Sequence, residues 1–162
     1  MDEKKIEITV YEASGINELT GEEAALFEKA ADATCRSYAP YSQFHVGAAV
    51  LLDNGEIICG SNQENAAYPS GLCAERVALF YAMSKFPHAA VCAIAIHATV
   101  NGKPHPDPVY PCGACRQVLL ECENRSRQPI KVIMGSAQKI QIVHSVSDLL
   151  PLGFDKFKDL KN

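Results

Sequence analysis

Apolar residues follow two patterns along this chain, and the patterns predict strands with different surroundings. In residues 4–12, isoleucine and valine occupy every second position between charged or polar neighbours. This alternation predicts a short strand at the edge of a sheet or against a partner subunit. Residues 46–52 form a continuous run of small apolar residues, followed by the turn sequence Asp53-Asn54-Gly55 and a further segment at 56–60. This order predicts a β-hairpin.

Further strands are predicted later in the chain, at residues 90–98, 130–134 and 140–144. The first of these segments is almost wholly apolar. Such a composition is typical of a central strand that is buried on both faces of a sheet.

Segments with helical spacing of apolar residues separate these strands. Thr20-Gly-Glu-Glu23 has the form of a capping box and predicts the start of a helix that ends before Pro40. Further helices are predicted over residues 73–85 and 113–123. Residues 100–111 contain four prolines and predict a rigid loop that leads into the last of these helices.

Alternating strands and helices indicate an α/β fold, in which a three-layer α/β/α arrangement surrounds a mixed central sheet. With 162 residues, the chain is expected to form a single domain over residues 1–162, in which residues 1–20 are an N-terminal extension with a short strand. No apolar run approaches the ~20 residues of a membrane span. The charged N-terminus also lacks the apolar core of a secretion signal. We therefore expect a cytoplasmic protein without a membrane partner.

Charge and cysteine content narrow the class of function. The net charge is −4, and no basic cluster is longer than Arg125-Ser-Arg127, which argues against a nucleic-acid partner and favours a small neutral or cationic substrate. Seven cysteines are present. An odd number without a secretion signal argues for free thiols and a metal site rather than a disulfide framework. Cys35, Cys59, Cys92 and Cys122 are interpreted as buried structural thiols.

The remaining cysteines lie at predicted helix starts, where a thiolate is favoured. Cys73 follows a Pro-Ser-Gly turn, and both the positive helix end and Arg76 favour its ionised form. Cys112 and Cys115 begin the next helix, directly after a proline. Three thiolates leave the fourth tetrahedral position of a zinc ion open for water, and Glu75 is placed to carry that water's proton.

Cys112-x-x-Cys115 alone is also compatible with a redox pair or with half of a structural zinc site. Together with Cys73-x-Glu75 and the proline before Cys112, it matches the zinc deaminase signature, in which a metal ligand is followed two residues later by glutamate and then by Pro-Cys-x-x-Cys. The expected cofactor is therefore a catalytic Zn²⁺. Without that signature, Glu75 would be interpreted as a first-turn glutamate that stabilises the helix through its dipole.

Several further motifs resemble one known family. They occur between about Ala33 and Phe154, and are Tyr38-Ala-Pro-Tyr-Ser42, Phe44-His-Val-Gly-Ala48, Asn62-Gln-Glu-Asn65, Cys73-Ala-Glu-Arg76, Pro111-Cys-Gly-Ala-Cys-Arg-Gln117 and Leu149-Leu-Pro151 with Phe154. In this order, they resemble the small three-cysteine cytidine deaminases that usually assemble as homotetramers. The resemblance implies the cytidine deaminase fold and a nucleoside substrate.

The resemblance also implies roles for residues around the zinc ion. Glu75 would take a proton from zinc-bound water, deliver it to N3 of the pyrimidine and assist the departure of ammonia. Three thiolates give the zinc site a net negative charge, which hydrogen bonds to the sulfurs would partly withdraw. Arg76 and Gln117 match the residues that donate such bonds.

For the substrate, the resemblance implies a second set of contacts. Asn62 and Glu64 match residues that bind the ribose hydroxyls, although Asn62-Gln-Glu-Asn65 alone reads as a polar loop. Phe44 matches the ring that packs against the base, although alone it reads as a core residue. Ala66 and Ala74 match residues whose backbone contacts the base. Tyr68 and Phe154 match residues whose side chains reach the pocket of a neighbouring subunit.

The expected function is the deamination of cytidine and deoxycytidine to uridine and deoxyuridine in pyrimidine salvage. The alternatives are a deaminase of a modified cytosine nucleoside of the blasticidin type, a polynucleotide-editing deaminase, and a structural zinc module with four protein ligands. The absence of a basic channel argues against the second alternative. The chain departs from the family pattern at two places. Residues 1–20 have no matching segment, which bears on the assembly, and the 100–111 loop is long and rich in proline, which bears on substrate entry and substrate range.

Overall fold

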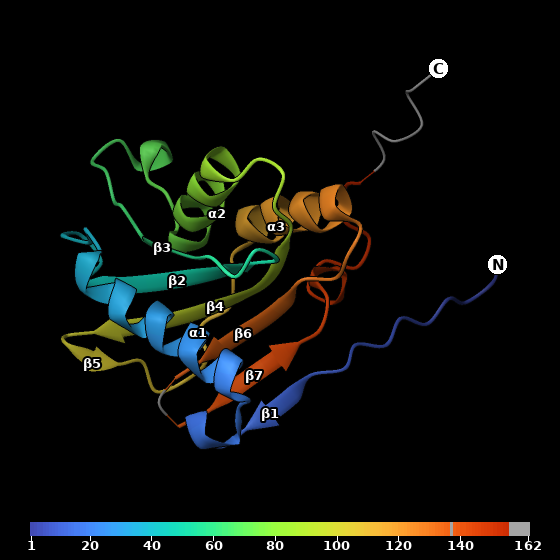
Figure 1. The fold of residues 1–162 in the computed structure, drawn as a ribbon, viewed down its shortest axis with the longest axis horizontal. Coiled ribbons are helices and arrows are strands. Elements are labelled where there is room, and N and C mark those ends of the chain that lie inside the picture. Colours follow the sequence, from blue (N-terminus) through green and yellow to red (C-terminus); the bar gives the residue numbers. More distant parts are fainter. Residues whose placement is uncertain (137, 156–162) are drawn as a thin grey trace.

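The computed structural model describes residues 1–136 and 138–155. Over these residues, a seven-stranded mixed sheet has the order β1-β7-β6-β4-β2-β3, with β5 paired to β4 (Figure 1). Strands β4 and β6 pair in parallel, and the other neighbours pair antiparallel. The strands are β1 (Tyr11–Ala13), β2 (Phe44–Leu52), β3 (Ile57–Ser61), β4 (Val91–Val100), β5 (Lys103–Pro104), β6 (Lys131–Gly135) and β7 (Ile140–Val143).

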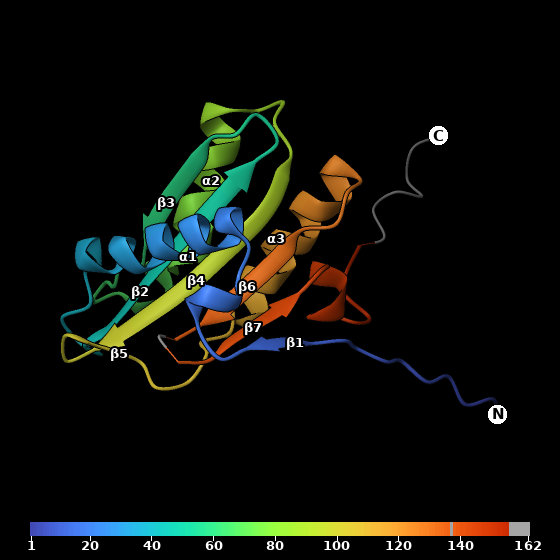
Figure 2. The same cartoon turned by 60° about the horizontal axis from the view of Figure 1, so that its bottom comes forward.

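Helices cover both faces of this sheet. Helix α1 (Gly21–Ala33) lies on one face, and α2 (Ala74–Lys85) and α3 (Gly113–Ser126) lie on the other (Figures 1 and 2). The structure therefore has the three layers that the sequence pattern predicts. The N-terminal capping box is present as expected, because the backbone N–H of Glu23 donates to the Thr20 hydroxyl and the Glu23 carboxylate accepts from the backbone of Thr20.

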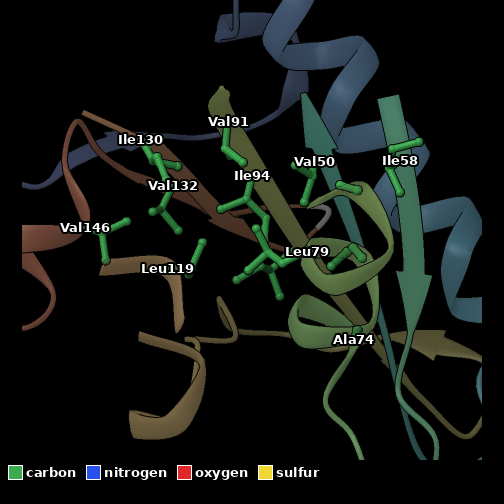
Figure 3. Close-up of a cluster of buried hydrophobic side chains, with 14 of the residues drawn as sticks. Val50, Ile58, Ala74, Leu79, Val91, Ile94, Leu119, Ile130, Val132 and Val146 are labelled. Carbon is green, nitrogen blue, oxygen red and sulfur yellow. The ribbon is translucent and has the colours of Figure 1, made fainter. Parts of the chain in front are cut away.

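Each helical layer packs on its own apolar core. On the α2 and α3 side, Leu79 and Leu119 meet Ile94 of the central strand β4 (Figure 3). On the α1 side, Leu26 and Phe27 form a separate apolar cluster with Ala95 of β4. The central strand contributes to both clusters, which explains its continuous apolar sequence.

Two glycines allow helices to approach the sheet at backbone distance. A Cβ atom at Gly47 of β2 would lie 2.1 Å from the carbonyl oxygen of Ala30 in α1. A Cβ atom at Gly60 of β3 would lie 2.5 Å from the backbone nitrogen of Ala78 and 2.7 Å from the carbonyl oxygen of Ala74. The first turn of α2 is therefore seated directly on β3.

Several predicted boundaries were wrong. The strand expected over residues 4–12 pairs only at Tyr11–Ala13, opposite Ile140–Ile142 of β7, and residues 4–10 extend beyond this pairing. The expected 100–111 loop contains β5, which forms a hairpin with β4. Helix α3 continues to Ser126, three residues beyond its predicted end. Cys35 is exposed rather than buried, because it lies in a short turn after α1, and Cys59, Cys92 and Cys122 are only partly buried.

Among the described helices, none has the length and apolar character that a membrane crossing requires.

Candidate metal centre

Three cysteine side chains from the starts of two helices meet at one point. Cys73 is the N-cap residue of α2, Cys112 is the N-cap residue of α3, and Cys115 follows in the first turn of α3. The sulfur of Cys112 lies 3.8 Å from that of Cys73 and 3.6 Å from that of Cys115. Sulfur atoms that share one tetrahedral zinc ion, each at about 2.3 Å, lie about 3.8 Å apart, so the three thiols fit this metal.

The topology of the sheet explains how these distant residues meet. Strand β3 leads into α2, and β4 leads through the β5 hairpin into α3, so both helices begin near the same point although Cys73 and Cys112 are 39 residues apart. Helix α3 then carries the chain back, on the face that α2 also covers, to β6, which pairs in parallel with β4. The three Sγ atoms lie within 4.8 Å of one another as a result.

The surroundings favour one thiolate in this cluster before any metal binds. The pKa of Cys73 is lowered to about 5, first by the hydrogen bond from Cys115 and then by contacts with Arg76 and Cys112. Conversely, the same bond to Cys73, together with burial, raises the pKa of Cys115. Zinc requires deprotonated sulfur, so metal binding is expected to release the protons that remain.

Glu75 places a carboxyl group beside this cluster. The residue is only 4% exposed, in the first turn of α2. Burial raises its pKa above the ordinary value, and the negative Cys73 sulfur raises it further. A buried carboxyl group that binds a proton readily, next to a metal site, is suited to proton transfer.

Arg76 faces the same sulfur atoms. Its Nη2 atom lies 3.8 Å from the Cys73 Sγ. Its buried Nε atom has no partner among the described residues. Gln117, which is predicted to donate to a sulfur, instead donates from Nε2 to the carbonyl oxygen of Phe154 at 2.8 Å. Its predicted role toward the thiolates stays a prediction.

A cavity of about 790 Å³ opens beside the thiols. Two of the three cysteines line it, and so do several residues predicted to contact the substrate; these are Cys73, Cys112, Arg76, Asn62, Glu64, Ala66 and Tyr68. Ala74 is fully buried at the first position of α2, so its contact with a substrate would come from its backbone. A second cavity, of about 570 Å³ along β3, is lined by residues such as Lys29, Arg36 and Cys59 and holds none of the predicted site residues.

Asn62 is fixed in the cavity wall by hydrogen bonds. Its Oδ1 atom accepts from the Ser37 hydroxyl at 2.6 Å and from the Val46 N–H at 2.8 Å. Its Nδ2 atom donates to the carbonyl oxygen of Phe44 at 2.9 Å. The amide thus joins the 37–42 loop to the start of β2.

Glu64 is fixed in the same way. Its carboxylate accepts from the hydroxyl of Ser42 and from the backbone N–H groups of Tyr41 and Ser42. These bonds, led by the one from the Ser42 side chain, lower the pKa of Glu64. The carboxylate therefore stays ionised and holds the loop against the cavity.

The aromatic residues predicted at the substrate have different positions. The ring of Phe44 meets the ring of His105 edge-on, with centroids 5.7 Å apart, and Phe44 is not among the residues that line the cavity. Tyr68 is 92% exposed and Phe154 is 65% exposed. Both side chains present most of their surface outside the fold of this chain.

A sequence model of the cytidine and deoxycytidylate deaminase zinc-binding region matches residues 21–129. The chain belongs to this deaminase family. The match includes all three cysteines and Glu75, and the predicted Zn²⁺ cofactor and family are thereby confirmed. Residues 1–20 lie outside the matched span.

Relatives within the deaminase family cover most of this chain. A cytidine deaminase of Halalkalibacterium halodurans is 43% identical over 130 residues, which span 80% of this chain and 91% of the relative. One of Sporosarcina psychrophila is 42% identical and covers 75% of this chain and 82% of its own length. The crystal structure of cytidine deaminase from Burkholderia pseudomallei has a TM-score of 0.70 and 38% identity, covering 84% of this chain and all of that one. The predicted α/β fold class is confirmed by this likeness.

Sequence reasoning missed two residues near the deaminase site. Ser42 holds Glu64, and its place in the Tyr-Ser pair of the 38–42 loop is a weak signal for that role. His105 contacts Phe44 only because the β5 hairpin folds back along β4, where the His105 N–H donates to the carbonyl oxygen of Ala98. No sequence signal identifies this contact.

Proposed function

We propose that this chain is a zinc-dependent hydrolase that deaminates cytidine and deoxycytidine to uridine and deoxyuridine in cytoplasmic pyrimidine salvage. The observation that carries the proposal is the buried carboxyl group of Glu75 beside three converging thiols, two of which, Cys73 and Cys112, line a cavity. The relatives from H. halodurans and S. psychrophila, both cytidine deaminases, support the same reaction. Hydrolysis of an exocyclic amine needs a positioned proton carrier, which Glu75 provides.

A zinc ion held by Cys73, Cys112 and Cys115 would lower the pKa of water and so supply a nucleophile near neutral pH. Glu75 accepts the proton of the attacking water and transfers it to N3 of the cytosine ring. Water oxygen bonds to C4 in this step. Glu75 then takes the second proton from the oxygen on C4 and delivers it to N4, so that the C4–N4 bond breaks, ammonia leaves and C4 becomes a carbonyl. The raised pKa of Glu75 suits a group that both accepts and returns a proton.

The neighbours of Cys73 tune the charge of this site. The Arg76 guanidinium lies 3.8 Å from the Cys73 sulfur and withdraws negative charge from it. Less charge on the sulfurs leaves the metal a stronger Lewis acid. We assign Gln117 a supporting role in the same charge balance.

The nucleoside would lie along the wall that Asn62 and Glu64 form. Both side chains are held by hydrogen bonds before substrate arrives, so little side-chain freedom is lost on binding. We assign them the ribose hydroxyls, and we assign the backbone of Ala66 and Ala74 to the base. Phe44 packs against the base from the start of β2.

Tyr68 and Phe154 support a site that is completed by self-association. Large aromatic side chains that are mostly exposed are typical of surfaces covered by a partner. We therefore propose a homotetramer in which these two residues reach a neighbouring pocket. Sedimentation of zinc-loaded protein should give the mass of four 17.6 kDa chains or a multiple of four. A monomer across micromolar concentrations would remove this part of the proposal.

The activity is tested with zinc-loaded protein by the loss of cytidine absorbance and the release of ammonia. Wild-type protein should convert both cytidine and deoxycytidine. Glu75→Ala should retain one zinc per chain and lose at least about 10²–10⁴-fold in kcat, the range expected for loss of general acid–base catalysis. The matched control is Glu121→Ala, which removes an exposed glutamate from α3 and should keep the wild-type rate.

Other outcomes would lead to different functions. A loaded enzyme that converts only a blasticidin-type nucleoside would replace the substrate and draw attention to the β5 hairpin beside Phe44. Zinc bound by four protein ligands, with no turnover of any nucleoside, would indicate a structural metal module. Retained turnover in Glu75→Ala would refute the proton-transfer mechanism.

A further inference from the structure

The first ten residues form an extended arm that leaves the body of the molecule at β1 (Figures 1 and 2). Ile6, Ile8 and Val10 are 49%, 46% and 45% exposed. Because they occupy alternate positions of an extended segment, all three lie on one face. Within the described parts of the chain, the arm has one ion pair, between Lys5 and Glu7 of the arm itself, and pairs with no strand of the body.

This arm also continues an open sheet edge. Strand β1 is the last strand on its side of the sheet, with β7 as its neighbour on the other side. Its outer N–H and C=O groups are a template for another strand. Within the described residues, the alternating apolar side chains of residues 4–10 are not buried by any other strand. Such alternation is typical of a strand that is buried on one face.

The arm is complementary to its own reverse. In an antiparallel pair of two copies centred on Ile8, each isoleucine and valine of the arm would face an isoleucine or valine, Lys5 would face Tyr11, and the ends would face opposite charges. The opposed positions would be Ile8 with Ile8, Ile6 with Val10, and Lys4 with Glu12, whose carboxylate also accepts from Gln141 and pairs with Lys139 of its own chain. A strand that is to pair with itself about a two-fold axis needs this symmetry.

Neighbouring registers lose this match. Pairing centred on Glu7 would place two Glu7 carboxylates directly opposite each other, which is destabilising. Pairing centred on Thr9 would place Ile6 opposite Glu12. A shift by a single residue would mix apolar and polar positions on both faces.

We propose that residues 4–12 form an antiparallel β-ribbon with the same residues of a second copy of this chain, centred on Ile8. The ribbon joins the β1 edges of two molecules and lies outside the span matched by the deaminase family. It does not depend on the proposed catalytic activity. The arm is thus a self-association element that lies apart from the residues of the metal centre.

Disulfide trapping tests both the ribbon and its register. In zinc-loaded protein with the exposed Cys35 replaced by serine, Ile8→Cys should form a disulfide-linked dimer under mild oxidation. Opposed Cα atoms of an antiparallel pair lie about 4.5–5.5 Å apart, within the range that a disulfide spans. Ile6→Cys is the matched control, because its two copies would lie four positions apart, about 14 Å, and should link at least about tenfold more slowly.

A mixed sample refines the test. Ile6→Cys and Val10→Cys chains, produced together, should link to each other faster than either variant links to itself. Turnover of cytidine by the reduced variants should equal that of the Cys35→Ser parent, which separates this result from any failure of the proposed function. The inference is overturned if Ile8→Cys links no faster than Ile6→Cys, or if the mixed sample yields no additional dimer.

Discussion

The carboxylate of Glu123 joins three segments of the chain, and its removal gives a quantitative test of the fold. The residue is 7% exposed near the end of α3. One oxygen accepts from the backbone N–H groups of Ile130, before β6, and Val146, after β7, each at 2.8 Å. The other oxygen accepts from the hydroxyls of Ser145 and Ser147, also at 2.8 Å.

Alanine at this position would leave two buried N–H groups without an acceptor. Each unsatisfied group costs about 1–3 kcal/mol, and the serine hydroxyls add less because they can turn to water. The expected loss in the free energy of unfolding for Glu123→Ala is therefore about 2–6 kcal/mol. Since the free energy of unfolding of native domains is about 5–15 kcal/mol in total, this single substitution would remove a large share of the stability.

Urea unfolding of zinc-loaded protein, followed by circular dichroism at one protein concentration, measures this loss. Glu121→Ala is the matched control, because Glu121 lies on the same helix and is exposed, and it should stay within about 0.5 kcal/mol of wild type. Glu123→Gln keeps one acceptor oxygen and should fall between the two. A Glu123→Ala protein as stable as Glu121→Ala would show that these hydrogen bonds do not hold the three segments together.

Three further predictions concern pH, packing and metal. At Glu123, burial alone would raise the pKa, but the hydrogen bonds from Ile130 and Val146 outweigh burial and lower it. The stabilisation by this carboxylate is therefore present above the unperturbed pKa of 4.5 and is lost as the pH falls through the lower pKa of the folded state. On acidification, wild type should lose more stability than Glu123→Gln, and equal losses would contradict this prediction. Gly60→Ala would force α2 away from β3 and should lower the free energy of unfolding by about 1–3 kcal/mol and reduce turnover. Gly113→Ala, whose Cβ would meet nothing within 4 Å, should be tolerated. Thermal melts and kcat measure these effects, and equal effects of the two variants would refute the close approach of α2 to β3. Removal of zinc by a chelator should abolish turnover and lower the melting temperature, and added zinc should restore both; an unchanged melting temperature would show that the metal does not support the fold.

The local signals in the sequence predicted most of the elements that build the site. The capping box at Thr20 marks the start of α1, and the cysteine motifs mark the starts of α2 and α3, because these signals depend on neighbouring residues alone. The α/β class followed from the order of strands and helices. The predicted convergence of three thiols needed the spacing of the motifs together with the deaminase signature.

Features that depend on distant partners were missed or misjudged. The alternation in residues 4–12 indicated a strand, but its paired length depends on β7, a distant segment whose pairing with the N-terminal residues covers only Tyr11–Ala13. Lys103-Pro104 carries no strand pattern and pairs only because β4 extends to Val100. Glu123 looks like a solvent-facing helix residue, since the groups that it binds come from two later segments. The bonds that fix Asn62 likewise come from residues 16 and 25 positions away.

The three thiols also make the metal centre a clip between two helices that the sequence separates. Closing a segment of 39 residues, as the Cys73 and Cys112 sulfurs do when they share an ion, removes conformational freedom from the unfolded chain. On the chain-entropy scale used for cross-links, a loop of this length corresponds to about 4 kcal/mol. The ion that would equip the chain for hydrolysis therefore also decides how long each molecule lasts. A chain without zinc is therefore expected to unfold more readily than a loaded one, so that metal loading and stability rise together.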